Sequence, residues 1–461
     1  MPLPKIIQNI FSLTAAEVAT KGITFFLFAY LARVLSVEGY GIMSNIIAII
    51  GYLNLIVVFG LNDIAIRSTA RKPELTQKYF ANITTIKVFF AVISFFLLLI
   101  YVFTNDFSDF ISICFVLGGI QLFAIAIHIE WIFIATERLK ILAVRQILIA
   151  SINLIGVLLF VKSVDDLPLY FVITSLAMLL NNSWLIKFAN VKIKLECDFN
   201  FIKSLLKQST PLWFSTLFSY IMGAFGIIYL AQTTDNSITG LFAAANKFFL
   251  FTMIPAFILL NSFSSRISQA DSIASKIIIV EKYCLFLFFI GSIISAVCFV
   301  FADLSIFITF GADFIPATNL LKILSFSILC FYVSCSAVLP LRLWGDEKRV
   351  FISYILSAIL LVGATIILSD IYSSVGTAVA SVLCELSLAI ISIIFLYRSL
   401  GRVFILRLVP FLLGSYFLTL LLRNIIELFS DNIYFLFIGI LLSVFIYFFG
   451  VIKLKIIDFD L

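Results

Sequence analysis

Long apolar windows alternate with short polar segments along the whole chain. Because a helix needs about 20 apolar residues to cross about 30 Å of hydrocarbon, this pattern predicts about fourteen membrane-spanning helices. Their expected ranges are 8–32, 40–65, 80–103, 110–135, 141–161, 167–189, 208–231, 239–263, 277–301, 318–341, 350–369, 374–397, 403–422 and 432–452. The pattern therefore predicts an all-α integral membrane protein.

Basic residues between the windows fall mostly on one side of the expected membrane. The loops on the side of the N-terminus hold about 24 Lys and Arg residues, against about four on the other side, and such an excess marks cytoplasmic loops. Arg138, Lys140 and Arg145 are assigned to one of these loops. We therefore expect both termini to lie in the cytoplasm.

Composition agrees with a membrane protein and argues against nucleic-acid, metal and cofactor binding. The 461 residues are 63% hydrophobic and 12% charged, whereas soluble domains are about 25% charged. The net charge of +6 comes from loop residues, so no nucleic-acid partner is expected. Seven scattered cysteines and a single histidine lack metal-ligand spacing, so we expect no metal and no cofactor. The first window is too long and too charged for a cleavable signal, so it is expected to remain as a span.

The chain divides into two similar halves. The longest polar connection, 187–207, follows the sixth window, and a short acidic and basic segment follows both the fourth and the tenth window. Equal halves with an even number of helices suggest parallel repeats, as in two-lobe transporters. We expect two pseudo-symmetric six-helix lobes, 1–192 and 193–400, followed by a C-terminal helix pair with a cytoplasmic tail, 401–461.

Two charges lie near the middle of the first window, Glu17 and Lys21. A charge at the centre of a membrane helix costs about 2.5–3.5 kcal/mol, so it is a candidate functional residue by default. The alternative is an ion pair without further function, because residues four apart share a helix face.

Further polar residues lie in the leading helices of each half. Asn45 and Lys87 belong to the first half, and Asn246 and Lys247 to the second, where Pro255 is expected to kink the eighth window. Buried lysines suit a phosphorylated headgroup. Lys87 and Lys247 could instead extend their amines to the membrane surface.

Deep acids are candidates for ion coupling. Glu130 and Glu385 lie in the fourth and twelfth windows, and Asp63 lies near the cytoplasmic end of the second. Each deep acid could carry a coupling proton or only bond to a neighbouring helix. His128, two residues before Glu130, is interpreted as a packing residue.

Four segments of the chain resemble polysaccharide transporters of the multidrug/oligosaccharidyl-lipid/polysaccharide exporter superfamily. ARVLSVEGYGIMSNIIAIIGYLNLIVVFGLNDIAIR from Ala32 resembles the family's "AR.LG.E.YG" segment, with Ser36 in place of the usual glycine. The matching positions are Ala32, Arg33, Glu38, Tyr40 and Gly41. WIFIATERLKILAVRQI from Trp131, YLAQTTDNSITGLFAAANKF from Tyr229 and SSVGTAVASVLCE from Ser373 resemble later segments, so the resemblance covers about the first 400 residues.

The resemblance implies a Wzx-type flippase of the bacterial inner membrane. Such proteins move undecaprenyl-pyrophosphate-linked O-antigen or capsule oligosaccharides from the cytoplasmic to the periplasmic leaflet by alternating access, with H+ or Na+ as the expected coupling ion. Polysaccharide polymerase and chain-length proteins are expected partners, besides the lipid bilayer. The expected substrate-binding residues are Lys21, Lys247, Asn45, Asn246, Arg33 and Lys87, and the ion-coupling candidates are Glu17, Asp63, Glu130 and Glu385.

Three other classes compete with this interpretation. A cation-coupled multidrug exporter of the same superfamily should have an acidic or aromatic cavity, whereas here deep lysines offset deep acids. A lipid II flippase matches fourteen helices but is expected to have an arginine-rich cavity, which this sequence lacks. A membrane polymerase or ligase would need acid and base groups on a large outer loop, so we expect no enzyme.

Overall fold

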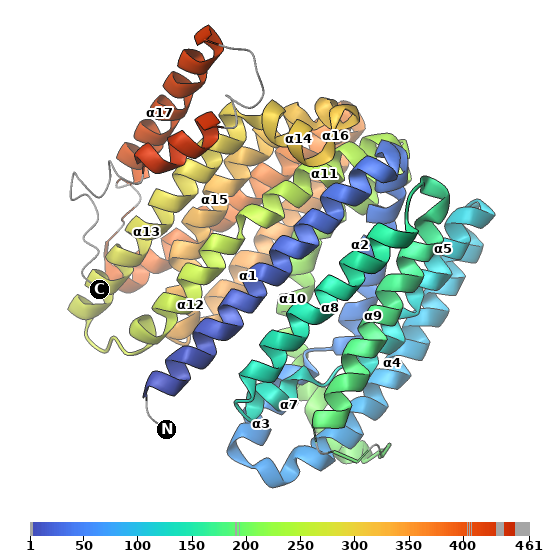
Figure 1. Cartoon of the computed structure of the whole chain (residues 1–461). Helices are drawn as coiled ribbons and strands as arrows, with labels where there is room; N and C mark the ends of the chain where they lie inside the picture. The colour runs from blue at the N-terminus through green and yellow to red at the C-terminus, as the bar shows by residue number, and fades with distance from the viewer. Residues whose placement is uncertain are drawn as a thin grey trace. The chain divides into compact units, whose positions relative to one another are not determined.

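The computed structural model describes residues 3–189, 191–192, 194–402, 404, 406, 408–429 and 438–447, and these hold helices and no strand (Figure 1). Eleven stretches within them are long and apolar enough to cross a membrane. The last, Glu347–Leu400, consists of two helices joined at a kink at Ser373, and the shorter apolar helices Val409–Ile425 and Ile438–Tyr447 follow. The described residues thus hold fourteen apolar helical segments, which confirms the predicted all-α, multi-pass class.

Two compact units make up the chain, Met1–Ala224 and Phe225–Leu461. We call them the N-terminal and C-terminal units. Helix α10, Phe199–Thr233, begins in the first and ends in the second. The limits 1–192, 193–400 and 401–461 expected from the sequence stay predictions.

In the N-terminal unit, the helices pack against one another in pairs. Helix α1 packs against α8, α8 against α9, and α2 against α4. The helices are α1 Leu3–Val34, α2 Ser36–Val58, α3 Leu61–Arg71, α4 Thr76–Thr104, α5 Asp109–Gly119, α6 Gln121–Ala126, α7 Glu130–Ala135, α8 Leu139–Phe160 and α9 Leu167–Phe188, with 3-10 turns at Pro73–Leu75 and Val164–Asp166.

Two spans of this unit are interrupted. Helix α2 ends at Phe59 and Gly60, both with positive φ, before α3 begins. Glycine lacks a Cβ and tolerates this conformation. The other span is broken between α6 and α7, at Ile127–Ile129. The short helices α3 and α7 that follow the breaks pack together, around a buried apolar cluster that includes Leu61, Ile64, Ile132 and Phe133.

The segment between α9 and α10 is bound to α4. The Gln77 side-chain amide donates to the carbonyl of Lys192 (2.8 Å) and accepts from the Lys192 N–H (3.0 Å). Lys78 forms an ion pair with Asp198 (3.0 Å). The side chain of Asp198 also accepts from the N–H of Phe201 in the first turn of α10, so the start of α10 is fixed to α4.

In the C-terminal unit, α13 packs against α15 and α17, and α15 packs against α16. Pro255 lies in the first turn of α12, directly after the break that ends α11, where the sequence predicts a kink. The helices are α11 Asn236–Thr252, α12 Ile254–Ser268, α13 Ile273–Val300, α14 Ala302–Phe310, α15 Thr318–Leu343, α16 Glu347–Leu400 and α17 Leu408–Phe429, with a 3-10 segment at Ala312–Ala317.

The C-terminal helices are attached to α13 and α14. Arg423 of α17 pairs with Asp303 (2.8 Å). The ring of Tyr447 stacks on Phe289 with centroids 5.1 Å apart, and its hydroxyl lies 3.0 Å from that of Ser292. The expected cytoplasmic tail after residue 452 lies outside the described residues.

Replacing Gly60 tests the break between α2 and α3. Gly60→Ala should lower the free energy of unfolding by at least about 1 kcal/mol, because alanine is strained at positive φ. Its Cβ would also lie 3.2 Å from the carbonyl oxygen of Ser209. Thermal unfolding of the purified protein in detergent measures the change. The control is Gly363→Ala in α16, where a Cβ meets no atom within 4 Å, and this variant should be at least as stable as the parent. Equal changes in the free energy of unfolding for the two substitutions would contradict backbone strain at position 60.

Candidate functional site

Lys87 of α4 is a buried cation, 1% exposed. Its Nζ donates to Asn62 Oδ1 (2.6 Å) and lies 3.5 Å from the backbone carbonyl oxygen of His128. A buried charge needs such partners, because leaving it unbonded is costly. The amine therefore does not extend to the surface, which was the alternative considered for Lys87.

The backbone carbonyl of His128 is available as an acceptor because the helix is broken at this point. The N–H of Ile132 donates to Ile129 and not to His128, so the carbonyl of His128 lacks its regular helical donor. The carbonyl of Ala124 also lacks its regular helical donor, because the N–H of His128 donates to the carbonyl of Ile125. The side-chain amide of Asn182 donates to Ala124. Lys87 and Asn182 thus replace the missing helical hydrogen bonds.

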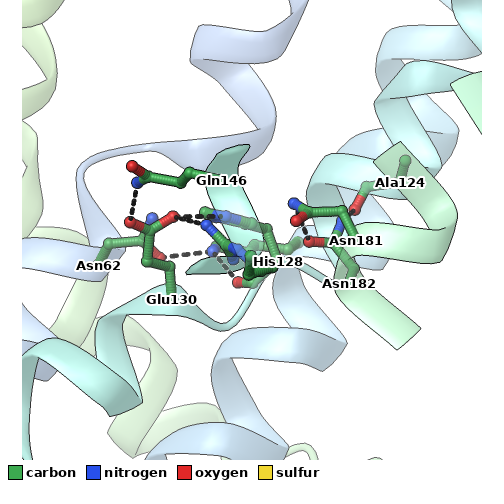
Figure 2. Close-up of polar contacts among 9 residues, drawn as sticks. Asn62, Ala124, His128, Glu130, Gln146, Asn181 and Asn182 are labelled. Carbon is green, nitrogen blue, oxygen red and sulfur yellow. Dashed lines mark hydrogen bonds and ion pairs between the residues drawn. The ribbon is translucent and has the colours of Figure 1, made fainter. Parts of the chain in front are cut away.

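Glu130 is the first residue of α7, where a carboxylate is favoured by the helix dipole. Its Oε2 lies 3.0 Å from Arg145 Nη2 and 3.2 Å from His128 Nε2, and its Oε1 accepts from Gln146 Nε2 (3.3 Å). Figure 2 shows these contacts converging between the helices. The Arg145 side chain is 3% exposed, so the ion pair is largely shielded from solvent.

We call Asn62, Lys87, His128, Glu130, Arg145 and Gln146 the polar cluster. It joins the first turns of α3 and α7 to α4 and α8, so it fixes the short helices that follow both breaks. Within the described residues, Arg145 Nε and Nη1 and Gln146 Oε1 have no hydrogen-bond partner. Among the same residues, no three His, Cys, Asp or Glu side chains are grouped to hold a metal ion.

Sequence reasoning identified Lys87 and Glu130 but missed Arg145 and Gln146. Arg145 was assigned to a cytoplasmic loop, whereas it is buried in α8. An arginine and a glutamine side by side within an apolar helix are the signal that could have identified them. His128, interpreted as packing, contacts Glu130 through its ring.

The other candidates of the N-terminal unit lie on α1, α2 and α3. Lys21 and Arg33 of α1 are exposed and Glu17 is partly exposed. A Cβ added at Gly22 would meet no atom within 4 Å, so the helix surface beside Lys21 is open. Asn45 of α2 is buried, and its Oδ1 has no partner among the described residues. Asp63 of α3 is exposed.

In the C-terminal unit, the candidates lie on α11 and α16. Asn246 is buried and Lys247 partly exposed, both on α11. Glu385 of α16 is 7% exposed, and its Oε2 has no partner among the described residues. The roles assigned to all these residues stay predictions.

Breaking the ion pair of the polar cluster tests its contribution to stability. Arg145→Gln should lower the free energy of unfolding by about 3 kcal/mol, because it leaves the Glu130 carboxylate partly buried without its cation. The double variant E130Q/R145Q should lose less than the sum of the single variants. Thermal unfolding in detergent of the parent and the three variants measures this coupling. Strictly additive losses would show that the pair contributes nothing of its own.

Solved membrane transporters share the fold. A structure of the lipid II flippase MurJ in an inward closed conformation matches with a TM-score of 0.72 and 16% identity, over 96% of this chain and 98% of that one. An inward-facing multidrug resistance transporter of the MATE family, in the MOP superfamily, matches with a TM-score of 0.63 and 12% identity, over 84% and 94% of the two chains. At these identities the similarity establishes the fold alone.

Sequence relatives point to one family. A protein of Shigella dysenteriae described as a candidate O-antigen transporter is 24% identical over 252 residues, which are 52% of this chain and 62% of that protein. The match thus spans less than two thirds of the relative. The model of a family described as polysaccharide biosynthesis protein matches residues 6–266, more than half of the chain. The resemblance found in the sequence is confirmed, and the chain belongs to the polysaccharide biosynthesis protein family.

Proposed function

We propose that this protein is a flippase for lipid-linked oligosaccharides. Its cargo is an undecaprenyl-pyrophosphate-linked O-antigen or capsule unit, moved from the cytoplasmic to the periplasmic leaflet of the bacterial inner membrane by alternating access. Family membership, the relative's description and the fold shared with a lipid II flippase support this function. Coupling to H+ or Na+, cytoplasmic termini, and polymerase and chain-length partners belong to the same proposal.

The observation that carries the proposal is the exposure of Lys21 within a membrane span. It is an exposed cation inside the apolar span Ala15–Val34, where contact with lipid would be costly. An exposed cation attracts an anionic cargo through charge complementarity, and a pyrophosphate group is such an anion. The open helix surface at Gly22 leaves room for it. Lys247, Asn246, Asn45 and Arg33 are proposed to contribute to binding.

Ion coupling is assigned to acids that differ in their surroundings. Glu17 and Asp63 are accessible, whereas Glu385 is buried and its Oε2 has no hydrogen-bond partner among the described residues. Glu130 already binds Arg145, His128 and Gln146. This occupied carboxylate is the weakest of the four candidates. Lys87, predicted to bind substrate, likewise has protein partners in this conformation.

Loss of the gene distinguishes the flippase from its competitors. Deletion should accumulate undecaprenyl-linked repeat units confined to the inner leaflet and remove the surface polysaccharide. Normal polysaccharide with increased dye sensitivity would indicate a multidrug exporter. Accumulated lipid II would indicate a lipid II flippase.

Substitution of Lys21 tests the residue that carries the proposal. Lys21→Ala should abolish surface polysaccharide in the complemented deletion strain at unchanged membrane level, because the cargo pyrophosphate loses its cation. Lys21→Arg keeps the charge and should retain part of the activity. Lys140→Ala, an exposed lysine at the start of α8, is the matched control and should act as the parent. Full polysaccharide with Lys21→Ala would remove this residue from the mechanism.

A further inference from the structure

Helix α10 is attached to α2 by one side. The indole N–H of Trp213 donates to the Leu55 carbonyl (2.9 Å), and its ring stacks on Phe59 with centroids 4.9 Å apart. Tyr220, seven residues later, donates to the Ala48 carbonyl (3.2 Å), and its ring meets Tyr52 edge-on. Because seven residues are close to two helical turns, both anchors share one side of α10. They fix the rotation of the helix.

The side of α10 away from these anchors is polar. Gln208, Ser215 and Ser219 recur at spacings of seven and four residues, which puts them on one face. Thr216 and Gly223 lie at the edge of this face, toward the anchored side, because each is three residues from an anchor. Gln208, Thr216 and Ser219 are exposed, and Ser215 is partly exposed. A Cβ added at Gly223 would meet no atom within 4 Å. We call Gln208, Ser215, Thr216, Ser219 and Gly223 the polar face of α10.

This face is unsuited to contact with lipid. It belongs to a membrane-spanning stretch, Phe199–Thr233, yet it exposes an amide and hydroxyls whose acceptor oxygens hydrocarbon cannot bond. By contrast, exposed Ile359, Leu360 and Ile367 surround Gly363 of α16, as expected of a lipid-facing surface. The polar face of α10 is therefore better suited to contact with water or a polar ligand.

The chemistry of the face suits a sugar. The hydroxyls of Ser215 and Thr216 donate to the carbonyls of Pro211 and Leu212, at 3.1 and 3.0 Å, so their oxygens can accept from ligand hydroxyls. Phe214 and Phe218 form an aromatic border beside the face, with centroids 6.5 Å apart. Pyranose rings combine hydroxyl groups with apolar C–H faces, and this pattern of acceptors beside aromatic rings complements both.

We propose that the polar face of α10 binds the sugar portion of the cargo and contributes to its selection. This inference rests on the proposed flippase function and adds a second subsite to it. The face has no charged member, so it recognises uncharged hydroxyl-rich rings. The pyrophosphate is left to the cation Lys21.

Filling the open position on the face is the first test. Gly223→Leu should lower transport at least about tenfold, because its side chain would occupy space needed by the sugar. The matched control is Gly363→Leu, which also enters open space but on an apolar surface, and it should transport as the parent does. Both are measured in the deletion strain, as surface polysaccharide and accumulated lipid-linked units at equal membrane level. Equal transport by the two leucine variants would overturn the inference.

Removing hydroxyls tests recognition without added bulk. Ser219→Ala should slow transport about fivefold, the equivalent of one hydrogen bond. The assay uses proteoliposomes and the lipid-linked repeat unit extracted from the deletion strain, compared with the same lipid carrying only its first sugar. The full repeat should be slowed more than the single sugar. An unchanged ratio would overturn sugar recognition by this face, even if both rates fall.

The two proposals fail in distinguishable ways. Failure of the parent protein to transport the extracted lipid would overturn the flippase function, and the sugar subsite with it. Transport by the parent and equally by Gly223→Leu and Ser219→Ala would overturn the subsite and leave the function standing.

Discussion

Carbonyl oxygens left over at the break between α6 and α7 must find donors within the protein, because hydrocarbon supplies none. Asn182 of α9 and Lys87 of α4 are these donors. The break has no glycine or proline to cause it, so it depends on these side chains. Through Asn62 and Glu130, the same contacts extend to the starts of α3 and α7. The end of the N-terminal unit that contains α3 and α7 is thus held by replaced backbone hydrogen bonds as well as by its apolar cluster.

Charges inside the spans therefore differ in their surroundings. Lys87, Glu130 and Arg145 have protein partners and are largely buried, which suits a role in positioning helices. Lys21 is exposed on an apolar helix, which suits a role in binding cargo. Membrane depth alone does not separate these cases. The exposure of each side chain does, and it comes from the folded structure.

The spans were predictable from the sequence because hydrocarbon thickness sets their length. Gly60 could also suggest a break. The break at Ile127–Ile129 could not be predicted, because no local residue causes it and its donors lie on other helices. The loop-charge pattern places Arg145 in a loop, because it counts a basic residue as exposed, whereas this arginine is buried. The two sides of α10 could not be predicted either, because Trp213 and Tyr220 donate to carbonyls of α2, which is distant in the sequence.

The burial of the Arg145–Glu130 pair has a consequence for ionic strength. Mobile ions screen exposed charges over about 8–10 Å at physiological salt, but they screen a shielded pair much less. Added salt should then weaken the attraction between Lys21 and an anionic cargo while the polar cluster keeps its strength. If Lys21 binds the cargo as proposed, ionic strength separates its interaction from those that hold the fold.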